Sequence, residues 1–300
     1  MRVVSHCGYK CMKELPATYL LTNLLDVDAV ENDVFLGHKL PSSSGRVFGG
    51  QVLGQALMAA CKTVESSKLV HSCHNYFIRP GNSDLPIHYT VHRDLDGRTI
   101  SNRRVVATQN DKPIFNLIAS FQGPAEGYHH QIEMPTNVPS PDNLLNENQL
   151  AEKHKAVLPD NVYSMLNRYR PIEVRPINEE AHFLRSPKKL EQATWFRAKE
   201  ALKDDMAMHR AILAYATDLT LLSTCGRPHE MLWMDSNVAT ASIDHTVWFH
   251  SNNIKTDQWL LYLMDTPWSG NGRGLNRGSI FTQSGELVAS VAQEGLVRIK

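Results

Sequence analysis

The stretch RVFGGQVLGQALMAACKTV (46–64) decides how the first half of the chain folds. Behind its glycine pair, Leu53, Leu57 and Ala60 recur at spacings of four and three residues, which predicts an amphipathic helix. Residues 74–122 follow as short alternating, aromatic or β-branched runs separated by turn residues, a pattern that predicts strands. We therefore expect one helix followed by an antiparallel meander.

The second half repeats this order. Its helix is expected in MHRAILAYATDLTLLSTCG (208–226). Strands are expected near 171–178, 193–199, 245–253, 259–268, 272–283 and 286–295. When the halves are aligned, Asn110-Asp111 and Ser284-Gly285 fall at the same hairpin, and Gln122 falls at the position of Gln293. A helix wrapped by an antiparallel sheet, present twice in tandem, is an α+β arrangement.

The same comparison divides the chain. Between the two halves lies a Pro-rich, polar segment without hydrophobic periodicity, which is typical of a linker. We expect a flexible N-terminus at 1–18, a first unit at 19–124, a linker at 125–168 and a second unit at 169–300.

Composition excludes several classes of protein. The chain has 300 residues, 42% of them hydrophobic, with 31 basic and 31 acidic side chains, so no overall charge attracts nucleic acid or a membrane surface. No run approaches the roughly 20 apolar residues of a membrane span. The first 15 residues lack the apolar region of a secretory signal, although a short organellar presequence stays open.

The cysteines and short motifs predict no metal and no cofactor. Five cysteines, an odd number and mostly far apart, fit a reducing compartment better than a disulfide framework. Cys7 and Cys11 with His6 lack the fourth ligand of a zinc site. The 14 histidines are scattered, and the chain contains no G-x-S-x-G, H-E-x-x-H, P-loop or G-x-G-x-x-G motif.

The last predicted strand contains an unusual polar residue. Leu287, Ala289, Val291 and Gln293 share one face by the two-residue period of a strand, so Gln293 completes an apolar row. A neutral amide at such a position needs hydrogen-bond partners, and it can hold water through its nitrogen or its oxygen. Gln293 is therefore a candidate site residue.

The chain resembles the type II acyl-CoA thioesterases, the family of bacterial thioesterase II and the animal peroxisomal acyl-CoA thioesterase. The resemblance runs from about FLGHKL to QEGLVRIK and is most specific in RVFGGQVLGQAL, HSCHNYFIRPG, MHRAILAYATDLTLL, IDHTVWFH and AQEGLVR. It implies a tandem double hotdog fold, each half a central helix wrapped by an antiparallel sheet. It also implies hydrolysis of acyl-CoA, with no cofactor, in a homodimer or higher homo-oligomer.

The family uses an aspartate, a serine or threonine, and a glutamine to hold and activate water. Matched residue by residue, the resemblance implies Asp218, Ser242 and Gln293 as the catalytic residues. The helical pattern, extended through Leu222, places Asp218 at the border of a buried face, where desolvation raises a carboxyl pKa and suits a general base. A structural aspartate bonded to a neighbouring backbone group is the alternative.

Other parts of the site are less specific. Gly49-Gly50 at the start of the first helix could supply N–H groups to an oxyanion, or could only permit close packing. Arginines on the predicted strands are candidates for CoA phosphates: Arg103, Arg104, Arg273, Arg277 and Arg298. The first helix contains no acidic residue between Gly49 and Val64, so we expect one active site per chain.

Two other functions and two compartments stay open. A hotdog hydratase or dehydratase would use different acid-base residues, and a non-catalytic acyl-CoA binding module would lack turnover. Family resemblance implies a peroxisomal enzyme, whereas the final Arg298-Ile299-Lys300 is no peroxisomal address, so the cytoplasm is the alternative.

Overall fold

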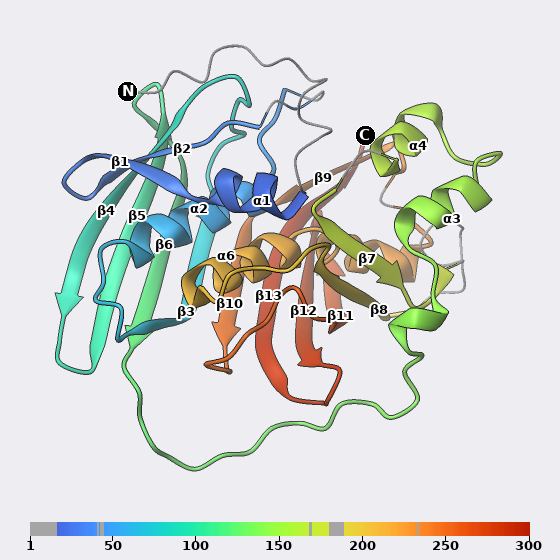
Figure 1. Ribbon diagram of the computed structural model, residues 1–300. Helices are drawn as coiled ribbons and strands as arrows, with labels where there is room; N and C mark the ends of the chain where they lie inside the picture. Colours follow the sequence, from blue (N-terminus) through green and yellow to red (C-terminus); the bar gives the residue numbers. More distant parts are fainter. Residues whose placement is uncertain (1–16, 41, 43–44, 168–169, 180–188, 233) are drawn as a thin grey trace.

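The computed structural model describes residues 17–40, 42, 45–167, 170–179, 189–232 and 234–300 (Figure 1). Of the expected flexible segment 1–18, residues 1–16 lie outside the described residues, and so do His6, Cys7 and Cys11. Residues 17 and 18 already belong to a helix, α1. The first unit therefore begins with a helical turn that the sequence analysis did not predict.

The described residues of the first half form two helices and six strands. In chain order these are α1 (Ala17–Leu25), β1 (Val27–Glu31), β2 (Val34–Gly37), α2 (Gly49–Cys61), β3 (Leu69–Phe77), β4 (Ile87–Asp96), β5 (Ile100–Gln109) and β6 (Lys112–Gln122). The predicted helix and the meander that follows it are confirmed. Asn110 and Asp111 both have positive φ in the β5–β6 hairpin, as the expected two-residue turn requires.

The second half repeats the plan. Its elements are β7 (Ile172–Pro176), β8 (Glu191–Ala198), α6 (Met206–Thr217), the 3₁₀ segment η3 (Leu222–His229), β9 (Val238–Ser242), β10 (Asp244–Phe249), β11 (Leu260–Gly270), β12 (Arg273–Thr282) and β13 (Leu287–Ile299). Each predicted strand is present. The short strand β9, which pairs with β13, was not predicted from the sequence.

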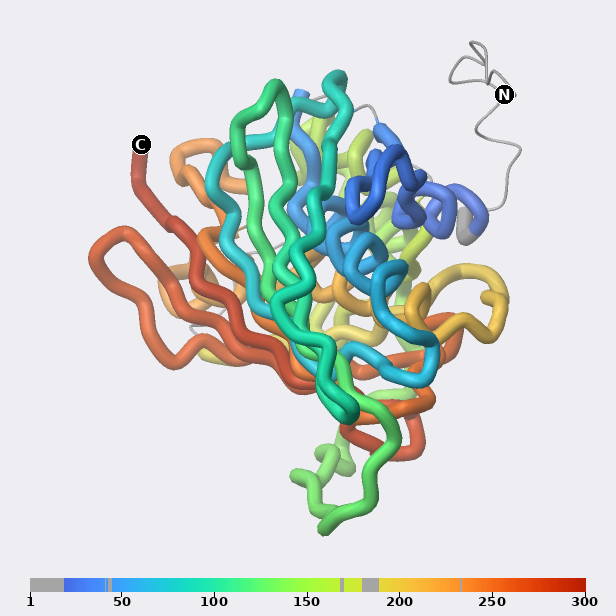
Figure 2. Tube along the Cα trace, turned by 90° about the vertical axis from the view of Figure 1, so that its left-hand side faces the viewer, coloured from blue at the N-terminus to red at the C-terminus, as the bar shows by residue number. Residues whose placement is uncertain are grey.

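The strands of the described residues join one antiparallel sheet. Its order is β1-β2-β4-β5-β6-β3-β10-β13-β12-β11-β8-β7, with β9 beside β13. The halves meet where β3 pairs with β10, with Tyr76 opposite Asp244 and Ser72 opposite Trp248. Seen from the side, α1 and α2 (blue) lie on one side of β4, β5 and β6 (teal to green), so these helices lie against one face of the sheet (Figure 2).

The core lies between this face and the two central helices. Helices α2 and α6 pack against each other, and their apolar side chains join one cluster with inward residues of the strands of both halves. Leu53, Leu57, Ile212 and Leu213 are buried in it. Because the core is continuous across the repeat, the two halves form a single packed body.

Helix α6 is shorter than its apolar stripe suggests. The pattern was extended through Leu222, but the helix ends at Thr217, and Asp218 is its C-cap residue. The Thr217 hydroxyl donates to Ala214 O at 2.8 Å, and Leu219 N–H closes a tighter turn on Ala216 O at 3.1 Å. The placement of Asp218 within a helical stripe was therefore wrong: it stands at the helix end.

The segment between the halves contains two short helices, α3 (Glu147–Lys153) and α4 (Asp160–Leu166), after a 3₁₀ turn, η2 (Pro141–Asn143). Asn146 and Gln149 form a reciprocal capping box at the start of α3, a sequence signal that was missed. Before these helices the chain runs along the second half, where Pro139 O accepts from the Trp195 indole at 2.8 Å. The expected linker thus packs on the sheet that follows it.

The described part of the chain has no helix with the length and apolar content needed to span a bilayer. Within the same residues, no group of three or more His, Cys, Asp or Glu side chains is placed to hold a metal ion. The cysteines that can be seen, Cys61, Cys73 and Cys225, are free thiols.

Candidate active site

Asp218, Ser242 and Gln293 meet at the C-terminal end of α6. The Gln293 Nε2 donates to Asp218 Oδ1 at 2.7 Å and to Ser242 Oγ at 3.0 Å. The Ser242 hydroxyl lies 3.4 Å from Asp218 Oδ1 and donates to it. Three residues that are 24 to 75 positions apart in the chain thus form one hydrogen-bonded set.

The N-terminus of α2 closes the other side of this carboxylate. The backbone N–H of Gly50 donates to Asp218, and a Cβ on Gly49 would lie 2.7 Å from Asp218 Oδ2. A Cβ on Gly50 would lie 2.6 Å from Tyr215 O, so both positions require glycine. The sequence analysis left two roles open for Gly49-Gly50, donors to an oxyanion or close packing. The structure shows close packing at both glycines, and the N–H of Gly50 donates to the Asp218 carboxylate.

The two central helices differ at their N-termini. The side chain of Asp205 caps α6 by accepting from Ala207 N–H at 3.0 Å and Met208 N–H at 3.1 Å. At α2 the N-cap residue is Phe48, which has no side-chain acceptor. The positive end of α2 is therefore left to interact with an anion, here the carboxylate of Asp218.

Burial changes the acidity of the site. Desolvation raises the pKa of Asp218 to about 6, while hydrogen bonds from Gln293, Gly50 and Ser242 act to lower it. The side chain is only 5% exposed. A carboxylate with such a pKa is ionised at neutral pH, yet it accepts a proton far more readily than an exposed aspartate does.

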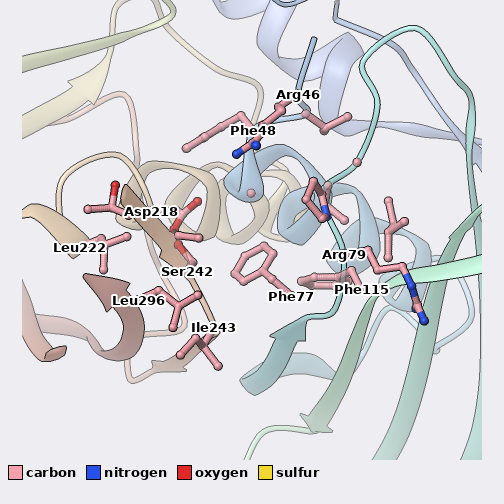
Figure 3. A pocket seen from close by; sticks show the side chains of 18 of the residues that line it. Arg46, Phe48, Phe77, Arg79, Phe115, Asp218, Leu222, Ser242, Ile243 and Leu296 are labelled. Atoms are coloured by element: carbon pink, nitrogen blue, oxygen red, sulfur yellow. Dashed lines mark hydrogen bonds between the residues drawn. The ribbon is translucent and has the colours of Figure 1, made fainter. Parts of the chain in front are cut away.

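A pocket with a volume of about 590 Å³ opens beside this set. Asp218 and Ser242 lie on one wall, and Phe77 and Phe115 lie opposite (Figure 3). Gln293 does not line the pocket: it is completely buried behind the other two residues. Its nitrogen is used by Asp218 and Ser242, and its Oε1 has no partner among the described residues.

Most of the lining is apolar and comes from both halves. The first half contributes Val47, Phe48, Val52 and Ile114 besides the two phenylalanines, and the second contributes Leu219, Leu222, Met231, Ile243 and Leu296. Two exposed arginines of the first half, Arg46 and Arg79, also line it. The pocket therefore combines an apolar interior with cationic groups at solvent.

The arginines proposed from the sequence lie elsewhere. Arg103 is 1% exposed and donates to Thr63 and Asp96, inside the first half. Three others form ion pairs on strands: Arg104 with Asp94, Arg273 with Glu294 and Arg277 with Asp265. Neither these four nor Arg298 lines the pocket, so the structure does not support them as phosphate ligands. Alternation along strands could not show which strand face borders the pocket.

The equivalent position in the first half is different. The C-cap of α2 is Lys62, which forms an ion pair with Asp26 at 2.9 Å. The C-cap residue of α2 is thus a cation, whereas that of α6 is Asp218. Gln122, aligned with Gln293 in sequence, is part-exposed at the end of β6, whereas Gln293 is fully buried. The residues of the first half that the structure describes contain no counterpart of the hydrogen-bonded set.

The structure adds His245, a residue that the sequence analysis did not single out. His245 on β10 is completely buried, with its Nδ1 3.9 Å from Asp218 Oδ1 and its Nε2 2.9 Å from Thr217 Oγ1. Burial lowers the pKa of His245 to about 3, so the ring is neutral. The sequence could have pointed to His245 by its inward position in the two-residue period of β10, the strand that pairs with β13, where Gln293 lies.

Comparison with known proteins shows the family of the chain. Residues 168–296 match a family model described as acyl-CoA thioesterase, and residues 39–122 match one described as acyl-CoA thioesterase N-terminal domain. Acyl-coenzyme A thioesterase 8 of Homo sapiens is 37% identical over 94% of this chain and 89% of its own length. Peroxisomal acyl-coenzyme A thioester hydrolase 1 of Saccharomyces cerevisiae is 24% identical over 92% of this chain and 94% of its own length.

A solved structure shows the same architecture. Acyl-CoA thioesterase II TesB2 from Mycobacterium marinum superposes with a TM-score of 0.76 and 37% identity, over 93% of this chain and 98% of that one. The two matched models cover one repeat each, and the relatives extend over nearly the whole chain. The chain therefore belongs to the acyl-CoA thioesterase family and has its tandem double hotdog fold.

Proposed function

We propose that the chain hydrolyses acyl-CoA thioesters to a free fatty acid and CoA, with Asp218 as the general base that activates water. The observation that carries this proposal is the hydrogen-bonded set of Asp218, Ser242 and Gln293 at the wall of an apolar pocket. Release of free thiol from a medium-chain acyl-CoA tests it directly.

The reaction begins when water, held by Asp218 and Ser242, attacks the thioester carbonyl. Asp218 takes one proton from the water as the new C–O bond forms. The tetrahedral intermediate then collapses, the C–S bond breaks, and the proton passes to the departing sulfur. Gln293 holds the two pocket-lining side chains in place through its Nε2.

The negative charge on the former carbonyl oxygen needs a donor. Gly50 N–H already serves Asp218, whereas Gly49 lies on the pocket wall at the same helix N-terminus. We assign the N–H of Gly49 to the oxyanion, because the unsatisfied N–H groups and the dipole of a helix N-terminus stabilise negative charge. The absence of a Cβ at Gly49 lets the substrate approach the backbone.

The apolar lining accommodates the acyl chain, and Arg46 and Arg79 are assigned to the phosphates of CoA. We expect Arg79→Ala to raise KM for acyl-CoA by about 3- to 10-fold, since an exposed charged hydrogen bond contributes modestly. The matching acyl-N-acetylcysteamine thioester, which lacks phosphates, should be hydrolysed with unchanged KM. Arg104→Ala, away from the pocket, is the control. An equal rise in KM for both substrates contradicts the assignment.

Ser242 is expected to hold water and not to become acylated. Ser242→Thr should keep most activity, because a hydroxyl remains. Ser242→Ala should lose about 10-fold in kcat, as one hydrogen bond of about 1 to 2 kcal/mol predicts. Steady-state kinetics of both variants measure this. An acylated Ser242 trapped by mass spectrometry overturns the role.

Two alternatives have no supporting observation here. A hydratase or dehydratase would change the acyl chain without releasing thiol, and a binding module would retain acyl-CoA intact. Thiol release separates hydrolysis from both. Because the C-cap residue of α2 is Lys62 and not a carboxylate, we also propose one active site per chain.

Three further proposals concern the domain boundaries, the assembly and the compartment. We propose the two units at 19–124 and 169–300. A homo-oligomer is supported by three apolar side chains on adjacent central strands: Tyr76, Ile118 and Trp248 are exposed by 57%, 52% and 38%. Light scattering can test this assembly.

The name of the yeast relative supports a peroxisomal location, and the cytoplasm is the alternative. Imaging the full chain with an N-terminal tag distinguishes them.

A further inference from the structure

A row of buried polar side chains crosses the inner face of the sheet beneath Asp218. Asn75, His245, Gln293 and Asn276 lie on the adjacent strands β3, β10, β13 and β12, and each is at most 2% exposed. In register, Asn75 is opposite His245, and Gln293 is opposite Asn276. Each has a polar atom without a partner among the described residues. Buried polar atoms of this kind usually have a role, so the row marks more than packing.

His245 is the titratable member of the row, and its tautomer follows from its neighbours. Thr217 has one hydroxyl proton, which it donates to Ala214 O at 2.8 Å. The 2.9 Å contact between Thr217 Oγ1 and His245 Nε2 must then be donated by Nε2–H. A neutral imidazole carries one N–H, so Nδ1 is a bare acceptor.

This bare acceptor faces the carboxyl group. Nδ1 of His245 lies 3.9 Å from Asp218 Oδ1 and has no hydrogen-bond partner among the described residues. An ionised carboxylate offers Nδ1 no proton, so two lone pairs face each other. A protonated carboxyl can turn its O–H toward Nδ1 and form a hydrogen bond. A hydrogen bond available only to the neutral form favours that form.

We propose that His245 is a positioning residue whose Nδ1, kept unprotonated by Thr217, favours the protonated state of Asp218 that forms when the carboxylate takes a proton from water. The inference rests on the proposed function of Asp218. His245 makes Asp218 a stronger base, whereas Gln293, Gly50 and Ser242 stabilise its ionised form.

Other titratable groups around Asp218 do not account for the preference for its protonated state. Tyr215 on α6 and Tyr262 on β11 are near it, and burial raises the pKa of Tyr215 to about 12 and that of Tyr262 well above 10. Both phenols are therefore neutral at neutral pH. The end of α2 contributes Gly50 N–H. The register neighbours of His245 and Gln293, Asn75 on β3 and Asn276 on β12, are neutral amides.

The test compares Thr217→Val with Thr217→Ser. Valine has the shape of threonine but leaves Nε2–H without an acceptor, so the proton moves to Nδ1, where the Asp218 carboxylate accepts it. The acid limb of the kcat/KM profile should then shift about one pH unit lower. Thr217→Ser should keep the limb at the wild-type pH. An unshifted limb in a folded Thr217→Val contradicts the proposal.

A second measurement does not depend on that variant. In protein labelled with ¹⁵N-histidine, the imidazole signal lost in His245→Gln identifies His245, and its ¹⁵N shifts report which nitrogen carries the proton. The expected result is the Nε2–H tautomer in the wild type. The Nδ1–H tautomer overturns the inference.

The two proposals fail in different ways. If the acid limb persists in the residual activity of Asp218→Asn, the limb does not belong to Asp218 and the proposed base is wrong. If the limb disappears with Asp218 but Thr217→Val leaves it unmoved, only the role of His245 is wrong.

Discussion

Asp218→Asn is expected to lower kcat by about 10²- to 10⁴-fold, or about 2.7 to 5.4 kcal/mol of barrier, while the protein still folds. Asparagine keeps the size of the side chain and an oxygen for Gln293 Nε2, but it cannot accept the proton of water. The loss should appear in kcat with little change in KM, because the pocket is unaltered. Kinetics with a medium-chain acyl-CoA measure it.

Two comparisons sharpen this result. Asp244→Asn is the matched control: burial also raises the pKa of Asp244, but this carboxyl accepts from Glu294 N–H at 2.8 Å and does not line the pocket. We expect it to stay within a few-fold of wild type. Gln293→Ala should lose less than Asp218→Asn, since it positions side chains and takes no proton. A folded Asp218→Asn with near-wild-type turnover would show Asp218 to be structural.

Asp218→Asn is also expected to be more stable than wild type at neutral pH, by up to about 3 kcal/mol. The pKa of Asp218 is about 6 in the folded protein, whereas the ordinary pKa of an aspartate, which applies to the unfolded chain, is 3.8. The folded state therefore binds more protons between these values, so stability decreases as pH rises from about 4 to about 6. At about 1.36 kcal/mol per pKa unit, the ionised carboxylate costs about 3 kcal/mol above this window.

The difference between two proteins isolates this effect from all other titrations. Denaturant unfolding of wild type and Asp218→Asn should give equal free energies near pH 4, with the variant more stable by pH 7. Asp244→Asn should show a smaller difference, because Asp244 is half-buried. A difference between wild type and Asp218→Asn that does not change with pH contradicts the raised pKa. Together with the kinetics, a stability gain would show that the site maintains a costly charge for catalysis.

Local pattern predicted the repeat and most of its elements. The spacings around Leu53 and the alternation around Val291 depend on neighbours within a few residues, and helix and strand periods follow from that range. The buried amide of Gln293 was visible for the same reason. The short elements α1, α3 and β9 were missed because their apolar residues are too few to set a period, and tertiary contacts fix them instead.

The sequence by itself determined two tandem helix-and-sheet units and, through the resemblance, pointed to Asp218, Ser242 and Gln293 as candidate site residues. Only the tertiary structure decided that α6 stops at Thr217, that Gly50 of the first half donates to Asp218, and that His245 faces the same carboxyl. These contacts join segments from different elements and both halves. Their geometry depends on how α2 and α6 pack inside one shared sheet, which no local period encodes.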